Sequence, residues 1–151
     1  MTAPEDYTVE LFLDEIEDII RANPDNINPS SNINPDDEYA GCVYRNPDKD
    51  YCLIGLWLNE KHPIIFKKME DNSHGDGWVY SLKEENGIKI FTSAEEILEN
   101  QGFSELVSEV SQFCQDLADK QFRNIDNQLT RNKWEDLLPK IDELRKNANA
   151  N

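Results

Sequence analysis

Residues 7–24, YTVELFLDEIEDIIRANP, carry apolar and acidic side chains in an order that a helix with one buried face satisfies. The apolar stripe recurs at helical spacing and consists of Val9, Phe12, Ile16, Ile19 and Ile20. Thr8 is placed to cap the helix, and Pro24 is placed to end it, because proline cannot continue the helical hydrogen-bond ladder. The rest of the chain must therefore cover this stripe, while the opposite side of the helix stays in water.

That opposite side is acidic. Glu10, Asp14, Glu17 and Asp18 lie there at helical spacing. Residues three or four apart on a helix are roughly 5–6 Å apart, which is near the spacing of phosphates along a nucleic-acid strand. The row can therefore imitate a nucleic acid, but ordinary solvated helices share this pattern, so both interpretations stay open.

Residues 23–38, NPDNINPSSNINPDDE, predict an Asn/Pro-rich connector on the surface. Asn-Pro occurs three times in this segment, and asparagine before proline favours turns and extended backbone over helix. The segment ends in three more acids, Asp36, Asp37 and Glu38, which join the helix acids as candidate partner-binding residues.

Two further segments predict β-hairpins, near 39–54 and near 78–91. In the second, Asn86-Gly87 favours a type I′ turn, because both residues accept positive φ. Gly55 is predicted to end the first hairpin, with a short helix following it. The rest of the chain indicates helices, with serine N-caps at 93 and 104 and a kink or a division at Pro139.

These elements predict a single α+β domain over 1–151, in which a small antiparallel sheet of two hairpins packs with four to five helices. Residues 147–151 are expected to form a disordered tail. A domain of this length buries roughly 70% of the surface of its unfolded chain, so it needs neither a disulfide nor a metal for stability. The predicted core consists of Phe12, Ile16, Ile19, Val43, Leu53, Trp57, Ile90, Leu106, Val110, Phe113 and Leu137.

Cys42 and Cys52 flank the turn of the first predicted hairpin, and they admit three interpretations: a disulfide, a pair of metal ligands or two buried thiols. Disulfides are rare in reducing compartments, and three cysteines leave one unpaired. Zinc sites usually take ligands in close pairs, whereas His62 and His74 lie far from either cysteine in sequence. We expect buried thiols, with no metal and no cofactor.

The stretch CVYR…YCLIGLWL resembles a loose set of small uncharacterised proteins of phages and mobile elements. Their pattern is Cys-x-Tyr, a short polar turn and Cys-x-Ile/Val-Gly-x-x-Leu, which corresponds here to Cys42, Tyr44, Cys52, Ile54, Gly55 and Leu58. The set also tends to end in a helix with a tryptophan, as at Trp134. The resemblance implies a phage-like origin and thiols packed around a hairpin, with Gly55 letting the next helix pack closely. It assigns no catalytic residue, and the hairpin near 77–91 and the acidic N-terminus depart from the pattern.

The net charge is −16, and eleven of the 31 acidic residues but only one of the 15 basic residues lie among the first forty. Such a surface repels nucleic acid and anionic membranes and attracts basic partners. No apolar stretch approaches the roughly 20 residues of a membrane span, and the N-terminus lacks a signal-peptide pattern. We expect a cytoplasmic protein.

Charge and motifs together favour a non-enzymatic acidic binding protein. In its specific form it is a phage-type inhibitor whose acidic face mimics nucleic acid and occupies the groove of a nucleic-acid-binding host-defence or regulatory protein, such as a CRISPR or restriction component. In its general form it is an acidic adaptor of an unidentified partner. The alternative is a small enzyme or ligand-binding protein with a pocket near Cys52, His62, His74 and Trp78.

Overall fold

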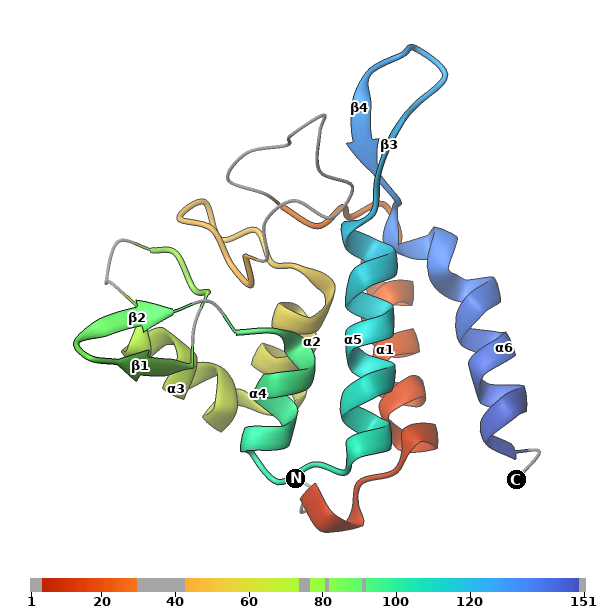
Figure 1. Cartoon of the computed structure of the whole chain (residues 1–151). Helices are drawn as coiled ribbons and strands as arrows, with labels where there is room; N and C mark the ends of the chain where they lie inside the picture. Colours follow the sequence, from red (N-terminus) through yellow and green to blue (C-terminus); the bar gives the residue numbers. More distant parts are fainter. Residues whose placement is uncertain (1–3, 30–42, 74–76, 81, 91, 150–151) are drawn as a thin grey trace.

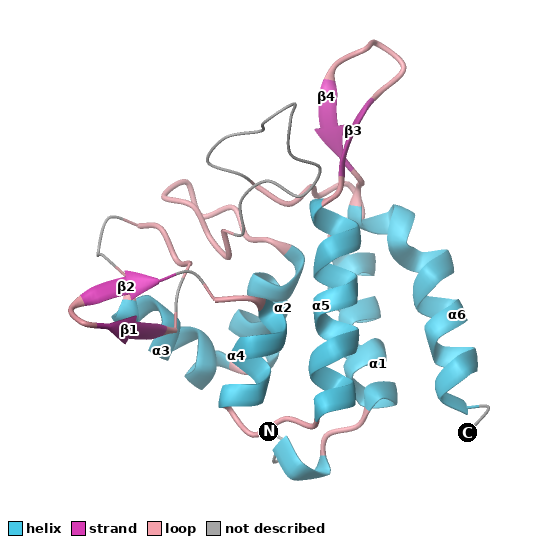
Figure 2. Ribbon diagram, in the orientation of Figure 1, coloured by secondary structure: helices cyan, strands magenta, loops and turns pink. Residues whose placement is uncertain are grey.

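The computed structural model describes residues 4–29, 43–73, 77–80, 82–90 and 92–149. Within these residues the chain forms six α-helices and two short antiparallel hairpins, which lie in separate two-stranded sheets (Figures 1 and 2). The predicted α+β class is confirmed. The described helices outnumber the predicted four to five, and the hairpins do not join into one sheet.

Helix α1 (Val9–Ala22) follows a short 3₁₀ turn, η1 (Pro4–Asp6), and lies at the centre of the helical part. It begins where the Thr8 hydroxyl accepts a hydrogen bond from the Leu11 amide, as the sequence predicts. Its buried face, which contacts α2, α5 and α6, consists of Phe12, Leu13, Ile16, Ile19 and Ile20. The predicted apolar stripe therefore does organise the core.

Part of the segment 23–38, which the sequence predicts as a surface connector, is buried in the interior. Asn28 is 3% exposed, and its amide donates to Asp119 Oδ1 at 2.8 Å. The side-chain oxygen of Asn28, Oδ1, accepts from the Leu53 amide at 2.8 Å and from Trp134 Nε1 at 3.0 Å. Burial raises the pKa of Asp119 to about 7, against the lowering effects of Asn28 and Arg131. The surface prediction is thus wrong at Asn28; residues 30–38 lie outside the described chain.

Within the described residues, the first predicted hairpin is reduced to a single antiparallel bridge between Arg45 and Tyr51. Arg45 makes isolated antiparallel bridges with Tyr51 and with Val79, and residues 39–42 lie outside the described chain. Helix α2 (Leu53–Lys61) begins where the sequence predicts a strand, with Cys52 as its N-cap. Distant residues decide this, because the first helical amides are bound by side chains that only the folded chain brings there.

Gly55 therefore lies inside α2 and does not end a strand. A Cβ at Gly55 would lie 2.2 Å from the carbonyl oxygen of Tyr44. The close packing that the resemblance implies for Gly55 is present, although the neighbour is the loop before the helix.

The second hairpin is confirmed in shortened form as β1 (Lys83–Glu85) and β2 (Ile88–Ile90). Asn86 and Gly87 adopt φ angles of 53° and 79°, as the type I′ turn requires. A further hairpin, β3 (Gln121–Arg123) and β4 (Leu129–Arg131), forms in a region expected to be helical.

The remaining helices are α3 (Pro63–Asn72), α4 (Ala94–Asn100) and α5 (Glu105–Asp119), followed by η2 (Trp134–Leu137) and α6 (Leu138–Asn149). The predicted serine caps are present, since the hydroxyls of Ser93 and Ser104 accept amide hydrogen bonds at the starts of α4 and α5. The chain divides next to Pro139, as predicted, but α6 continues through 147–149, where a tail was expected.

Most of the predicted core is buried, namely Phe12, Ile16, Ile19, Val43, Leu53, Trp57 and Leu137. Ile90 and Val110 are half-buried. The prediction is wrong for Leu106 and Phe113, which are 61% and 38% exposed. Both lie on α5, whose orientation is therefore the main difference between the predicted and the observed core.

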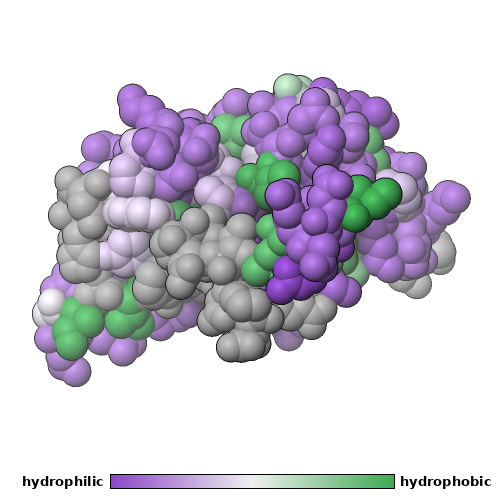
Figure 3. Space-filling view, turned by 90° about the horizontal axis from the view of Figure 1, so that it is seen from above, coloured by the Kyte–Doolittle hydropathy of each residue, from purple (hydrophilic) through white to green (hydrophobic). Residues whose placement is uncertain are grey.

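The face seen from the β3–β4 end is mostly hydrophilic, with apolar residues in scattered patches (Figure 3). Among the described residues, no helix combines the length and the apolar character needed to cross a bilayer.

Candidate partner-binding surface

Two of the predicted α1 acids, Asp14 and Glu17, form ion pairs with another helix of the fold. Arg145 of α6 lies 3.0 Å from Asp14 Oδ1 and 2.8 Å from Glu17 Oε1. Arg21 also binds Glu17, at 2.8 Å. Hydrogen bonds from Arg21 and Arg145 lower the pKa of Glu17. These carboxylates stabilise the contact between α1 and α6, and half of the predicted acidic row is thereby neutralised.

The other predicted acids divide into two groups. Glu10 is exposed and has no cationic partner within the described chain, while the Asp18 carboxylate lies 4.0 Å from Lys61 Nζ and is 72% exposed. The connector acids, Asp36, Asp37 and Glu38, lie outside the described residues. The α1 row therefore presents fewer free charges than the sequence suggests.

Helix α5 carries a second set of acids, which we name the α5 acidic strip: Glu105, Glu109 and Asp116. All three are exposed, and none forms an ion pair with another described residue. Their spacing of four and seven residues places them along one line about 16 Å long. Between them, Gln112 donates to Asp116 at 2.8 Å and accepts from the Glu95 amide of α4 at 3.1 Å.

The spacing of the α5 acidic strip is visible in the sequence. The strip is not among the predicted binding residues, because the apolar residues of the same segment have the spacing of a core stripe and dominate its pattern. Unlike Asp14 and Glu17 of α1, the three acids of the strip form no ion pair within the described chain.

The alternative pocket is not assembled. Cys52 and His62 cap opposite ends of α2, so roughly 15 Å of helical rise separates their backbones. Trp78 lines a hollow with Arg45 and other residues but with neither of these two. His74 lies outside the described chain. The Cys52–His62 pair therefore cannot act as a nucleophile and its base.

Cys52 has a structural role as the N-cap of α2. Its Sγ accepts from the Gly55 amide and from Gln115 Nε2, each at 3.1 Å, and the residue is 1% exposed. Burial raises the pKa of Cys114 to about 12. In the described part of the chain, Cys52 and Cys114 are buried and form no disulfide; Cys42 lies outside it. No three potential metal-ligating side chains of that part come together.

A buried polar cluster lies under α1. Glu15 Oε1 accepts from Trp57 Nε1 at 2.9 Å and from the Tyr7 hydroxyl, and His62 Nε2 lies 3.4 Å from the same oxygen. Burial raises the pKa of Tyr7 and lowers the pKa of His62. Because Tyr7, Trp57 and His62 are each at most 4% exposed, a substrate cannot reach them, and the cluster joins helices.

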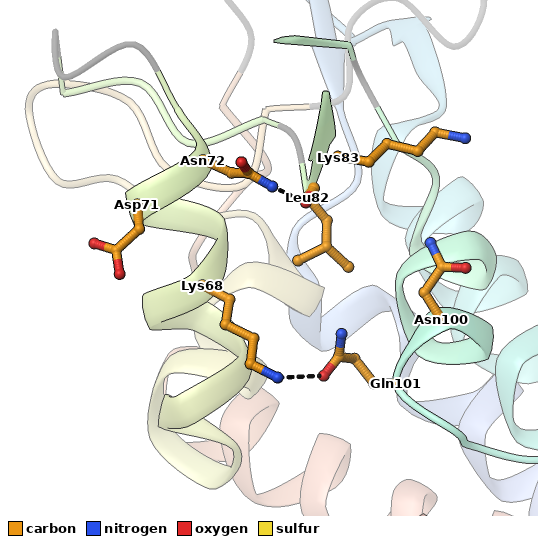
Figure 4. Close-up of a pocket in the computed structure, with 7 residues that line it drawn as sticks. All are labelled: Lys68, Asp71, Asn72, Leu82, Lys83, Asn100 and Gln101. Carbon is orange, nitrogen blue, oxygen red and sulfur yellow. Dashed lines mark hydrogen bonds between the residues drawn. The ribbon is translucent and has the colours of Figure 1, made fainter. Parts of the chain in front are cut away.

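An open hollow of about 480 Å³ lies between α3, β1 and α4 (Figure 4). Lys68 donates to Gln101 at 3.2 Å across it. The other lysine of the lining, Lys83, binds Glu96 and lies 3.8 Å from Glu85. The lining residues that the structure describes include no cysteine, histidine or serine.

Comparison with protein-family models, with curated proteins and with solved structures finds no match to this chain. The resemblance to phage and mobile-element proteins stays a prediction.

Proposed function

We propose that this protein is a non-enzymatic acidic binding protein that occupies the basic, nucleic-acid-binding surface of a partner protein. The observation that carries the proposal is the α5 acidic strip, Glu105, Glu109 and Asp116, whose carboxylates are exposed and without internal cations in the described chain. Arg145 compensates the charge of Asp14 and Glu17, whereas no cation of the described chain pairs with these three.

The long-range field supports the same function. A net charge of −16 steers a basic surface toward the protein and disfavours nucleic acid itself as a ligand. Glu99 of α4 and Glu10 of α1 are exposed on helices next to α5 and add to the field around the strip. The recognition surface thus centres on α5 instead of on the α1 row.

The specific form of the proposal is a phage-type inhibitor of a nucleic-acid-binding host-defence or regulatory protein. Two features support it: carboxylates in a line along α5, and the resemblance of the Cys42–Leu58 stretch to proteins of phages and mobile elements. The general form, an acidic adaptor of a basic protein, rests on the strip alone.

The test is affinity capture from a bacterial lysate treated with nuclease, at low and at high salt. The strip variant carries Glu105→Gln, Glu109→Gln and Asp116→Asn. The matched control, Asp48→Asn, Glu84→Gln and Asp126→Asn, removes the same charge from exposed positions elsewhere. We expect the wild type and the control to retain the same nucleic-acid-binding protein at low salt, and the strip variant to lose it. Equal retention by both variants would contradict the proposal.

A further inference from the structure

Helix α5 has an apolar strip that does not reach the core. Its residues at positions i, i+4, i+7 and i+11 are Leu106, Val110, Phe113 and Leu117. Leu106 is 61% exposed and Phe113 is 38% exposed, while the other two are half-buried. An exposed apolar stripe on a helix of a charged protein indicates an interaction surface.

The core side of α5 explains why this strip stays outside. That side carries small and polar residues, namely Val107, Ser108, Ser111, Cys114, Gln115 and Ala118, all buried. Gln115 turns inward to bind the Ile54 amide at 3.3 Å and Cys52 Sγ at 3.1 Å. Because these bonds fix the rotation of α5, the larger apolar side chains point to the neighbouring side of the helix.

A groove lies beside the apolar strip. Helix α6 packs on α1 and stands apart from α5 (Figure 1). A hollow of about 200 Å³ between them is lined by Val9, Leu106, Val110, Leu144, Asn147 and Ala148. A second hollow, of about 420 Å³, shares Val9, Leu106 and Ala148 with the first and continues toward Tyr7 and Glu10. The two form one groove with a mostly apolar lining, to which Thr8, Glu10, Ser104 and Asn147 add polar groups.

The charges around the groove are unequal. On the α5 side, Glu109 lies one helical turn from both Leu106 and Phe113, and Asp116 lies one turn from Phe113. Glu10 lines the second hollow. On the α6 side, Lys140 stands 5.5 Å over the Phe113 ring and also binds Glu143 at 3.2 Å. The groove is therefore mostly apolar along its length and acidic along its α5 edge.

We infer that this groove binds an amphipathic basic helix of a partner protein, which inserts apolar side chains between α5 and α6 and places lysines or arginines over Glu105, Glu109 and Asp116. An apolar helix face in an apolar groove is a common mode of peptide recognition, and here the acidic edge fixes the charge of the occupant. The inference rests on the proposed function, since it takes the partner to be basic. A second copy of this chain fits less well, because each copy carries −16.

The test uses a synthetic, dye-labelled peptide of leucine and lysine about four turns long, with leucines on one helical face. A scrambled peptide of the same composition has the same charge but no apolar face. The groove variant is Leu106→Ser with Phe113→Ser, and its control is Ile64→Ser with Ile125→Ser, which are also exposed apolar residues. All four positions are exposed, so the variants should fold.

We expect the amphipathic peptide to bind the wild type at least about tenfold more tightly than the scrambled one, and the groove variant to lose this difference while its control keeps it. If both peptides bind equally and only the strip variant weakens them, the groove inference fails and the proposed function stands. If neither variant changes binding, both fail. A wild-type dimer that the groove variant dissociates would overturn the inference in favour of a second copy.

Discussion

Single residues join distant parts of this fold, and Asn28 joins three of its elements. Its side chain contacts Leu53 at the start of α2, Asp119 at the end of α5 and Trp134 in η2. All of these contacts are buried, so removing the amide leaves several polar groups without a partner, and each such group costs about 1–3 kcal/mol.

We expect Asn28→Ala to lower the free energy of unfolding by about 3 kcal/mol, measured by urea denaturation. Asn26→Ala is the matched control, because the Asn26 side chain is exposed. It should change the stability by no more than about 0.5 kcal/mol. Equal effects of the two substitutions would mean that Asn28 is not the junction described here.

Gly55 gives a second prediction, in which Gly→Ala changes the stability in the direction opposite to the one usual in helices. In most helices Gly→Ala stabilises by roughly 0.5–1 kcal/mol. At Gly55 the new methyl group would lie 2.2 Å from the Tyr44 carbonyl oxygen, so we expect Gly55→Ala to destabilise the protein by roughly 2 kcal/mol. A melting temperature at or above that of the wild type would contradict this packing.

Single residues also show which hydrogen bonds can be predicted from the sequence. Ser93, Ser104 and the Asn86-Gly87 turn act on neighbours within a few residues, so the sequence predicts them correctly. The strand predicted around Cys52 is wrong, because the Leu53 and Ile54 amides at the start of α2 bind Asn28 and Gln115, which are distant in sequence. Local patterns predict local hydrogen bonds, and long-range ones need the fold.

Among the elements, α6 combines a buried apolar contact through Ile141 with ion pairs to α1. Arg145 reaches across to Asp14 and Glu17 on α1 and to Asp142 on its own helix. Such networks on a partly exposed surface contribute on the order of 1 kcal/mol.

We expect Arg145→Gln to reduce stability by about 1 kcal/mol near neutral pH. The pKa of Glu17 is lowered in the folded protein, so this contribution is present above the unfolded pKa of glutamate and is lost as the pH falls through the lower folded value. Urea denaturation of wild type and variant should therefore converge in acid. Lys146→Gln, the same charge change at an exposed position of α6, should have little effect. A pH-independent difference for Arg145→Gln would contradict the ion-pair account.

Helix α5 shows why the candidate surface was only partly predictable. Its apolar residues have the spacing of a core stripe, and the sequence therefore places Leu106 and Phe113 inside. In the structure Ser108, Ser111 and Gln115 are inside. The bonds of Gln115 to the Ile54 amide and to Cys52 select that face, and the two serine hydroxyls donate to backbone carbonyls one turn earlier, so they can be buried there. Burial by hydrogen bonding has no hydrophobic periodicity, so it leaves no signal that a periodicity argument can detect.

Over the whole molecule, some acidic residues form ion pairs within the fold and others remain exposed on the surface. The acids of α1 that the sequence analysis favoured are partly bound to Arg145, while Glu105, Glu109 and Asp116 on α5 remain exposed. We propose that this second set occupies the nucleic-acid surface of a partner, which predicts competition between the protein and nucleic acid for one site.

The most direct measurement is displacement of labelled DNA from the captured partner, followed by fluorescence anisotropy as wild type, strip variant or matched control is added. The account predicts that wild type and control release the DNA, with a potency that falls as salt rises, and that the strip variant does not. If the DNA stays bound while the wild-type protein also binds, or if the strip variant releases it as well as the wild type does, the claim is wrong.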